Sequence, residues 1–165
     1  MTERSATHGT FTLEREYDAA PARVFKAWAD PAIKARWFVG PSDWRLLERA
    51  IDFRIDGRER LSGRKGSGVV STFDAVYHDI VPDQRIIYCY DMRLDGVHIS
   101  ASLATVQLAP AGTGTRLTFT EQAVFLDGYD DSGSRERGTR ILLEQLGKHL
   151  QGYLRGRRAP AREAP

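Results

Sequence analysis

Early in the chain, hydrophobic and polar residues alternate. Over Thr10–Tyr17, Phe11 and Leu13 share one face and polar residues occupy the other, and a period of two is typical of a β-strand with one solvated face. The spacing then becomes helical after Pro21 and again after Pro31, and proline favours the first position of a helix. We therefore predict one strand followed by two short helices.

From residue 44 to residue 125 the pattern is again that of strands. Turn-forming pairs such as Asp56-Gly57 and Asp95-Gly96 separate them, and such short links favour antiparallel hairpins. The predicted strands are Trp44–Ile55, Arg58–Leu61, Gly68–Ile80, Arg85–Met92, Val97–Leu108 and Thr115–Phe125.

A long helix follows these strands, from about Ser134 to Leu154, with a broad apolar stripe. An antiparallel sheet with one apolar face needs a cover, which this helix supplies. We therefore predict an α+β fold in which a curved antiparallel sheet of six to seven strands wraps on the last helix. A cavity remains between sheet and helix unless large side chains fill it.

Composition indicates one globular domain, because the 165 residues are 41% hydrophobic and 28% charged. We expect a flexible N-terminus (residues 1–9), a folded domain (residues 10–154) and a disordered tail rich in Arg, Pro and Ala (residues 155–165). The sequence has neither a signal peptide nor an apolar segment of membrane length, so we expect a cytoplasmic protein.

The net charge of +2 comes from the expected tail, whose four arginines and one glutamate contribute +3. The rest of the chain then holds 20 basic and 21 acidic residues. A nearly neutral domain whose arginines are interleaved with acidic residues predicts neither a nucleic-acid nor a membrane partner.

Signatures of metal sites and of nucleophilic catalysis are missing. The histidines (His8, His78, His98 and His149) lack metal-ligand spacing, and the single Cys89 has no neighbouring base. We therefore expect no metal and no cofactor, and the sequence shows no nucleophile–base pair.

Glu121 stands among apolar residues of its predicted strand. It shares a face with Leu117, Phe119, Ala123 and Phe125, so its carboxylate is expected to point toward the core. A buried carboxylate must be paired, hydrogen-bonded or protonated. It is therefore either a polar anchor or acid/base group inside a ligand cavity, or a structural partner of an arginine or tyrosine.

Tyr88, Tyr90 and Met92 share one face of another predicted strand. Tyrosines that line an apolar space suit a ligand pocket with few polar contacts, and they equally suit an ordinary core. Trp37 and Phe38, at the end of the second short helix, are either core anchors or part of a cavity wall.

Several segments resemble a known superfamily. Tyr17–Pro31, followed by Ala35-Arg-Trp-Phe38, looks like the first strand and helix pair of SRPBCC proteins, and Gly112–Glu121 resembles a late hairpin of the same group. These proteins are START-like, helix-grip proteins related to the birch pollen allergen. Within the superfamily, the sequence is most similar to the activator of heat-shock protein 90 ATPase homologues, which implies a helix-grip fold.

The resemblance implies that a small hydrophobic or aromatic ligand binds between the sheet and the last helix. The residues expected to contact it are Trp37, Phe38, Tyr88, Tyr90, His98, Phe119, Glu121, Phe125 and Leu146. The first alternative is an enzyme similar to polyketide cyclases or aromatases, with Glu121 as general acid/base. The second is a co-activator that binds a chaperone. Either a monomer or a homodimer is compatible with the sequence.

One departure from the family pattern concerns the last helix. The family commonly carries Gly-Trp early in this helix, whereas this chain has Gly138-Thr139. Because a tryptophan there would pack against the sheet, its replacement by threonine predicts a roomier or differently shaped cavity.

Overall fold

The computed structural model describes residues 3–157 and shows one antiparallel sheet and three helices among them. The seven strands lie in the order β1-β7-β6-β5-β4-β3-β2. The strands are β1 (Ala6–Tyr17), β2 (Trp44–Ile51), β3 (Arg58–Lys65), β4 (Val70–Val81), β5 (Arg85–Leu94), β6 (Val97–Ala111) and β7 (Gly114–Leu126). The helices are α1 (Pro21–Ala29), α2 (Pro31–Trp37) and α3 (Ser132–Arg157).

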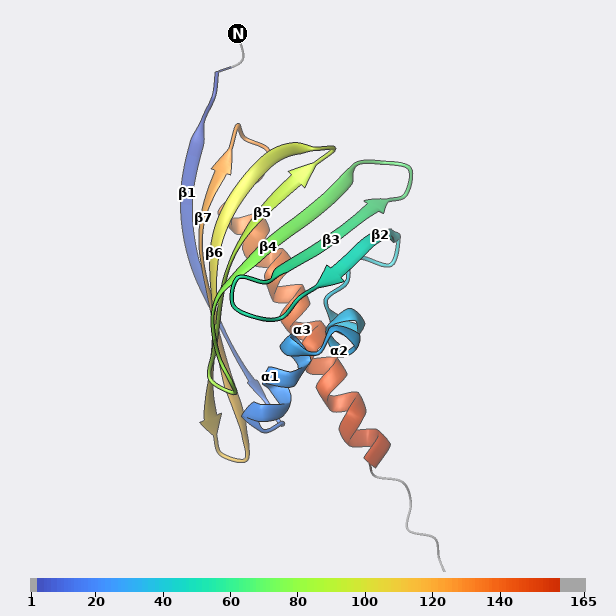
Figure 1. The fold of residues 1–165 in the computed structure, drawn as a ribbon, viewed down its shortest axis with the longest axis vertical. Coiled ribbons are helices and arrows are strands. Elements are labelled where there is room, and N and C mark those ends of the chain that lie inside the picture. Colours follow the sequence, from blue (N-terminus) through green and yellow to red (C-terminus); the bar gives the residue numbers. More distant parts are fainter. Residues whose placement is uncertain (1–2, 158–165) are drawn as a thin grey trace, which may run out of the picture.

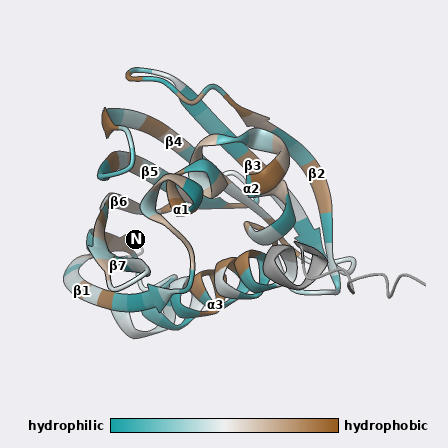
Figure 2. Ribbon diagram, turned by 90° about the horizontal axis from the view of Figure 1, so that it is seen from below, coloured by the Kyte–Doolittle hydropathy of each residue, from teal (hydrophilic) through white to brown (hydrophobic). Residues whose placement is uncertain are grey.

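The sheet curves around the long helix α3 (Figure 1), and α1 and α2 lie on the same concave side (Figure 2). Both short helices lie between β1 and β2 and begin at a proline, as predicted, and the Asp30 carboxylate caps α2 by accepting from the backbone N–H groups of Ala32 and Ile33. The predicted α+β helix-grip architecture is therefore confirmed.

Element boundaries differ from the prediction at both ends of the fold. Strand β1 begins at Ala6, where residues 6–9 pair with β7, so these residues belong to the sheet rather than to a flexible segment. Their small and polar side chains carry no hydrophobic alternation, and backbone hydrogen bonds hold them instead. Helix α3 runs to Arg157, three residues into the expected tail, and the rest of that tail lies outside the described residues.

A buried ion pair joins α2 to the sheet. Lys34 and Glu59 are 2% and 4% exposed, and Lys34 Nζ lies 2.6 Å from Glu59 Oε1, which also accepts a hydrogen bond from the Tyr77 hydroxyl. The ammonium group stands 4.6 Å from the centre of the Phe38 ring. These contacts fix α2, and with it the aromatic residues at its end, against the concave face.

Candidate functional site

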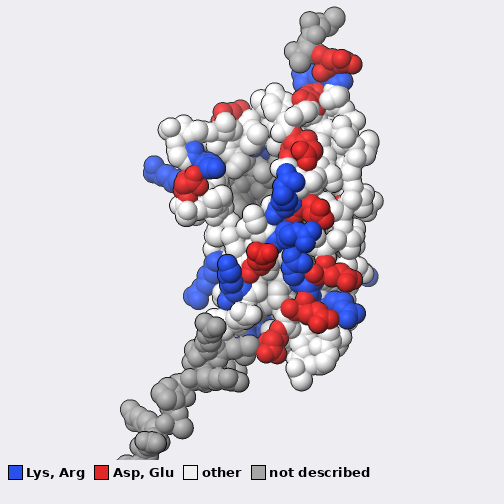
Figure 3. All heavy atoms as spheres, turned by 180° about the vertical axis from the view of Figure 1, so that it is seen from behind, with Lys and Arg blue, Asp and Glu red and all other residues white. Residues whose placement is uncertain are grey.

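A cavity of about 520 Å³ lies between the concave face of the sheet, the short helices and α3. Its wall is mostly aromatic and aliphatic, with Trp28, Trp37, Phe38, Phe73, Phe119 and Leu142 among its residues. Ile141, which is 55% exposed, also lines it, so the cavity is open to solvent at α3. The surface is hollowed beside the charged residues of that helix (Figure 3). This volume is in the range of small-molecule sites.

The structure brings six of the nine expected ligand contacts together. The residues that line the cavity are Trp37, Phe38, Tyr88, Tyr90, Phe119 and Glu121. Two of the other three are buried in the packed core: Leu146 is fully buried, and the Phe125 ring lies beneath the Arg135 guanidinium at 5.3 Å. Neither of them reaches the cavity.

His98 lies away from the cavity because the pairing of β5 with β6 is irregular. Ser100 and Ser102 of β6 face inward, and regular alternation would place His98 on the same side. The register shifts between Met92 and Arg93, however, which turns His98 to the other face of the sheet. There its Nε2 lies 3.1 Å from Asp91 Oδ1.

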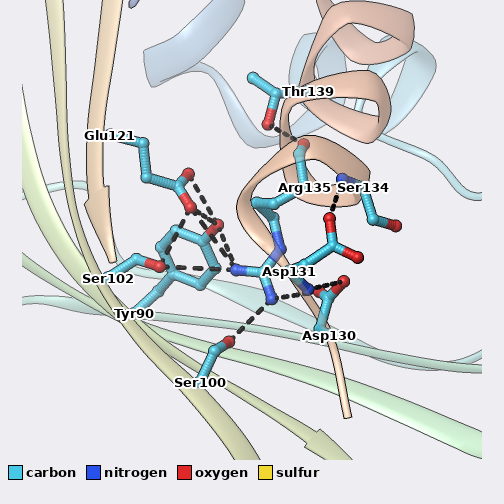
Figure 4. A network of polar contacts seen from close by, with 9 residues as sticks. All are labelled: Tyr90, Ser100, Ser102, Glu121, Asp130, Asp131, Ser134, Arg135 and Thr139. Atoms are coloured by element: carbon cyan, nitrogen blue, oxygen red, sulfur yellow. Dashed lines mark hydrogen bonds and ion pairs between the residues drawn. The ribbon is translucent and has the colours of Figure 1, made fainter. Parts of the chain in front are cut away.

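Glu121 is fully buried in the cavity wall, where three side chains contact its carboxylate (Figure 4). The Tyr90 hydroxyl donates a hydrogen bond and lies 2.8 Å from Oε1 and 2.9 Å from Oε2. Ser102 Oγ donates to Oε2 at 3.0 Å, and Arg135 Nη1 lies 3.5 Å from the same oxygen. The sequence therefore placed this carboxylate correctly in the interior, and its partners are a tyrosine, a serine and an arginine.

Arg135 projects from the first turns of α3 and bridges two carboxylates. Its Nη2 donates to Asp130 Oδ2 at 2.9 Å and to Ser100 Oγ at 2.8 Å, while its Nη1 donates to the Tyr90 hydroxyl at 2.9 Å. The start of the helix is fixed by Asp131, whose Oδ1 accepts from the backbone N–H of Ser134 at 2.8 Å. This cap sets the angle at which Arg135 enters the cavity wall.

Burial raises the pKa of Glu121, whereas Arg135, Tyr90 and Ser102 lower it, and burial has the larger effect. The pKa of the Tyr90 hydroxyl is raised as well, by burial and by the neighbouring Glu121 charge. Tyr90 is therefore a neutral hydrogen-bond donor, and Glu121 takes up a proton more readily than an exposed glutamate does.

The charged groups of the wall are paired with one another. Glu121, Asp130 and Arg135 are the only charged residues that line the cavity within the described chain, and both carboxylates contact the guanidinium. Each charged side chain in the cavity wall therefore already has a partner of opposite charge. Glu121 Oε1 accepts from Tyr90 alone among the described residues, which leaves it able to accept a second hydrogen bond.

Arg135, Asp130 and the serines of β6 were not predicted from the sequence. One signal for Arg135 was present, because it falls on the apolar stripe of α3 at helical spacing from Leu142 and Leu146. Because a buried carboxylate needs a partner of opposite charge, a cation is expected on the helix that covers the sheet. Asp130 and the serines gave no such signal.

The replacement of the family's tryptophan coincides with open space. Gly138 and Thr139 both line the cavity, and a Cβ added at Gly138 would meet no heavy atom within 4 Å. The structure thus has a void where the sequence predicts a roomier interior.

Two searches found known proteins that resemble this chain. A family model described as "Activator of Hsp90 ATPase homolog 1-like protein" matches residues 18–154. An uncharacterized protein from Rhizobium leguminosarum is 47% identical, with a TM-score of 0.86 over 91% of this chain and 99% of its own. A protein from Rhizobium loti is 48% identical, with a TM-score of 0.82 over 88% and 99% of the two chains. No curated protein matched.

A more distant structure supports the fold alone. The AHSA1-like protein from Aeromonas hydrophila is 20% identical, with a TM-score of 0.71 over 94% of this chain and 100% of its own. Within the described residues, no helix has the length and apolar character to cross a membrane, and no group of three or more potential metal ligands occurs.

Proposed function

Because the chain belongs to the family of Activator of Hsp90 ATPase homolog 1-like proteins, within the SRPBCC superfamily, whose fold is that of a ligand-binding domain, we propose that it binds a small, neutral, largely aromatic molecule. The observation that carries this proposal is the aromatic cavity of about 520 Å³ between the sheet and α3. A void of this size is not needed for the stability of a core, since close packing is more favourable.

The charge arrangement supports a neutral ligand. Glu121 and Asp130 share the single cation Arg135, so the cluster carries a charge of −1 when both carboxylates are ionised. An anionic ligand would be desolvated next to this charge without a partner, which is costly. A neutral molecule avoids this cost and gains from burial of its apolar surface.

Glu121 is the proposed anchor for one polar group of the ligand. Its Oε1 accepts one hydrogen bond, from Tyr90, and can accept a second, and the residue lines the cavity. A ligand hydroxyl would donate to this oxygen, while Tyr88, Phe73 and Phe119 would contact the aromatic part of the molecule. A hydrogen bond to a charged acceptor contributes more than a neutral one.

A titration of 4-hydroxystilbene by isothermal calorimetry tests the proposal. This neutral aromatic probe has one hydroxyl group, and we expect it to bind with one-to-one stoichiometry. The substitution Thr139→Trp puts an indole into the cavity and should weaken binding tenfold or more, about 1.4 kcal/mol. Lys148→Trp adds the same side chain at an exposed position of α3 and should leave the affinity unchanged. Equal affinities for the two variants would place the probe elsewhere.

The anchor is tested by comparing 4-hydroxystilbene with trans-stilbene, which lacks the hydroxyl. We expect the hydroxyl to improve binding by roughly 10-fold, and Glu121→Gln to remove most of this gain, because the charged acceptor is lost. A gain that persists in Glu121→Gln would show that the hydroxyl is bound by another group.

A second candidate function is acid–base catalysis, favoured by the raised pKa of the buried Glu121 beside the Tyr90 hydroxyl. The ionised Glu121 would remove a proton from the carbon between two carbonyl groups, and Tyr90 would donate a hydrogen bond to the enolate oxygen. Hydrogen–deuterium exchange at that carbon of benzoylacetone, followed by NMR, tests it. Acceleration that Glu121→Gln abolishes would support catalysis, and equal rates in both proteins would refute it.

A further inference from the structure

A second set of polar atoms lies in the cavity wall, apart from the Glu121 cluster, and it begins with Trp28. Trp28 is 3% exposed, lines the cavity, and its indole N–H has no partner in the described structure. The other two indoles are different: Trp37 donates to the Ala27 carbonyl at 2.9 Å, and Trp44 donates to Ser71 Oγ at 3.3 Å. Buried donors are almost always paired, so an unpaired one in a cavity wall points to a ligand atom.

Gln145 supplies the second unpaired atom. Its side-chain Oε1 is buried without a hydrogen-bond partner, and the residue lines the same cavity. Gln145 follows Arg135 by ten residues on α3, which corresponds to about 15 Å along the helix axis. It is therefore well separated from the charged cluster at the start of this helix.

Trp28 also lies on the side of the cavity away from Arg135. Its ring stacks on Phe119 of β7, with 6.5 Å between the ring centres, whereas Arg135 stands over the ring of Phe125. These two phenylalanines are six residues apart on β7, about 20 Å along an extended strand, and Glu121 lies between them, about 7 Å from Phe119 along the strand. The Arg135 guanidinium and Trp28 thus mark two separate regions of one cavity.

We propose that Trp28 and Gln145 form a second polar subsite, the Trp28 subsite, which binds a hydroxyl group of the ligand. A hydroxyl both accepts and donates, so it can accept from the indole N–H and donate to the amide oxygen. Both partners are neutral, which again selects an uncharged group. The ligand class that follows is an aromatic molecule with two hydroxyl groups, one for each subsite.

This inference rests on the proposed function, since it requires that the cavity binds an aromatic ligand. Glu121 would bind the first hydroxyl and the Trp28 subsite the second. A molecule with one hydroxyl satisfies only one of the two subsites, and the charged acceptor Glu121 binds that hydroxyl more strongly than neutral groups do.

The test compares 4-hydroxystilbene with 4,4′-dihydroxystilbene by calorimetry in the wild-type protein and in variants. We expect the second hydroxyl to tighten binding by roughly 3- to 10-fold in the wild type, as one neutral hydrogen-bonded group does. Trp28→Phe keeps an aromatic ring but has no N–H, and Gln145→Met keeps the length of the side chain but has no amide. Each should reduce the gain to less than about 2-fold.

Trp37→Phe is the matched control for loss of an indole from the cavity wall. Because the Trp37 N–H is already bound to the Ala27 carbonyl, this variant should weaken both stilbenes alike and keep the gain from the second hydroxyl. A full gain in Trp28→Phe or in Gln145→Met would contradict the role given to that residue.

The two proposals fail in different ways. If neither stilbene binds the wild-type protein, or if Thr139→Trp leaves binding intact, the cavity is not the site and the proposed function fails. If both bind in the cavity with equal affinity, or if the gain survives in both variants, only the Trp28 subsite fails.

Discussion

Removal of the Arg135 guanidinium should destabilise the protein strongly. The substitution Arg135→Met keeps an unbranched side chain and removes the only cation that contacts Glu121 and Asp130 among the described residues. Breaking a buried ion pair from one side costs about 3–5 kcal/mol. Glu121 keeps its hydrogen bonds from Tyr90 and Ser102, so we expect a loss of about 3 kcal/mol at neutral pH.

The loss can be measured by urea denaturation, followed by tryptophan fluorescence. With an m-value of about 2 kcal/mol per molar urea, the midpoint should fall by roughly 1.5 M. Arg137→Met, at an exposed position of the same helix turn, is the matched control and should stay within about 0.5 kcal/mol of the wild type. Adding Glu121→Gln to Arg135→Met should restore part of the stability, because the fully buried Glu121 charge is removed.

The pH dependence of the loss has a defined sign. Burial already raises the pKa of Glu121 in the wild type above the ordinary 4.5, so the folded state holds this proton more tightly than the unfolded chain does. The contribution of Glu121 to stability therefore falls as the pH rises from 4.5 through its higher folded pKa. Without Arg135 that pKa rises further, so Arg135→Met should be more harmful at pH 8 than at pH 5.

Two results would refute this reasoning. A loss below about 1 kcal/mol in Arg135→Met would show that the buried cluster does not depend on the cation. If the double variant Arg135→Met/Glu121→Gln is as unstable as Arg135→Met alone, the unpaired Glu121 charge is not the cause of the loss.

Further predictions concern the walls of the cavity. Lys34→Met leaves the buried Glu59 carboxylate without its cation and should lower the free energy of unfolding, measured by urea denaturation, by about 3–5 kcal/mol. Adding Glu59→Gln should recover part of this loss. Full stability in Lys34→Met would contradict the role given to this ion pair. Gly63→Ala places a Cβ 1.9 Å from ring atoms of Trp44, so the indole must move and we expect a cost of about 1–3 kcal/mol in a thermal melt. An unchanged melting temperature would show that this contact relaxes freely.

The sequence predicted the fold well because the spacing of hydrophobic residues and the positions of turn-forming residues determine which side chains are buried. The alternation around Glu121 placed its carboxylate inside, and the apolar stripe of α3 identified the helix that covers the sheet. Strand β1 was predicted too short because residues 6–9 are small or polar and only their backbone pairs with β7. Backbone pairing of this kind does not produce a pattern of hydrophobic and polar side chains.

The site was harder to predict because its contacts join distant segments. The ion pair of Glu121 with Arg135 depends on the angle of α3 across the sheet, which no local pattern encodes. His98 was assigned to the cavity wrongly, since one irregularity in the pairing of β5 with β6 reverses its face. The unpaired N–H of Trp28 is also a property of three-dimensional packing, because Trp37, only nine residues away, has a partner.

The most direct test of the central claim is a ¹H–¹⁵N NMR titration of the labelled protein with 4-hydroxystilbene. We expect shifts confined to residues that line the cavity, among them Tyr88 and Tyr90 of β5, Phe119 of β7 and Thr139 of α3. Leu46, Leu47 and Ile55, which are exposed on the surface, should not respond. Shifts centred on these exposed residues, or none at all with saturating probe, would contradict a ligand-binding cavity.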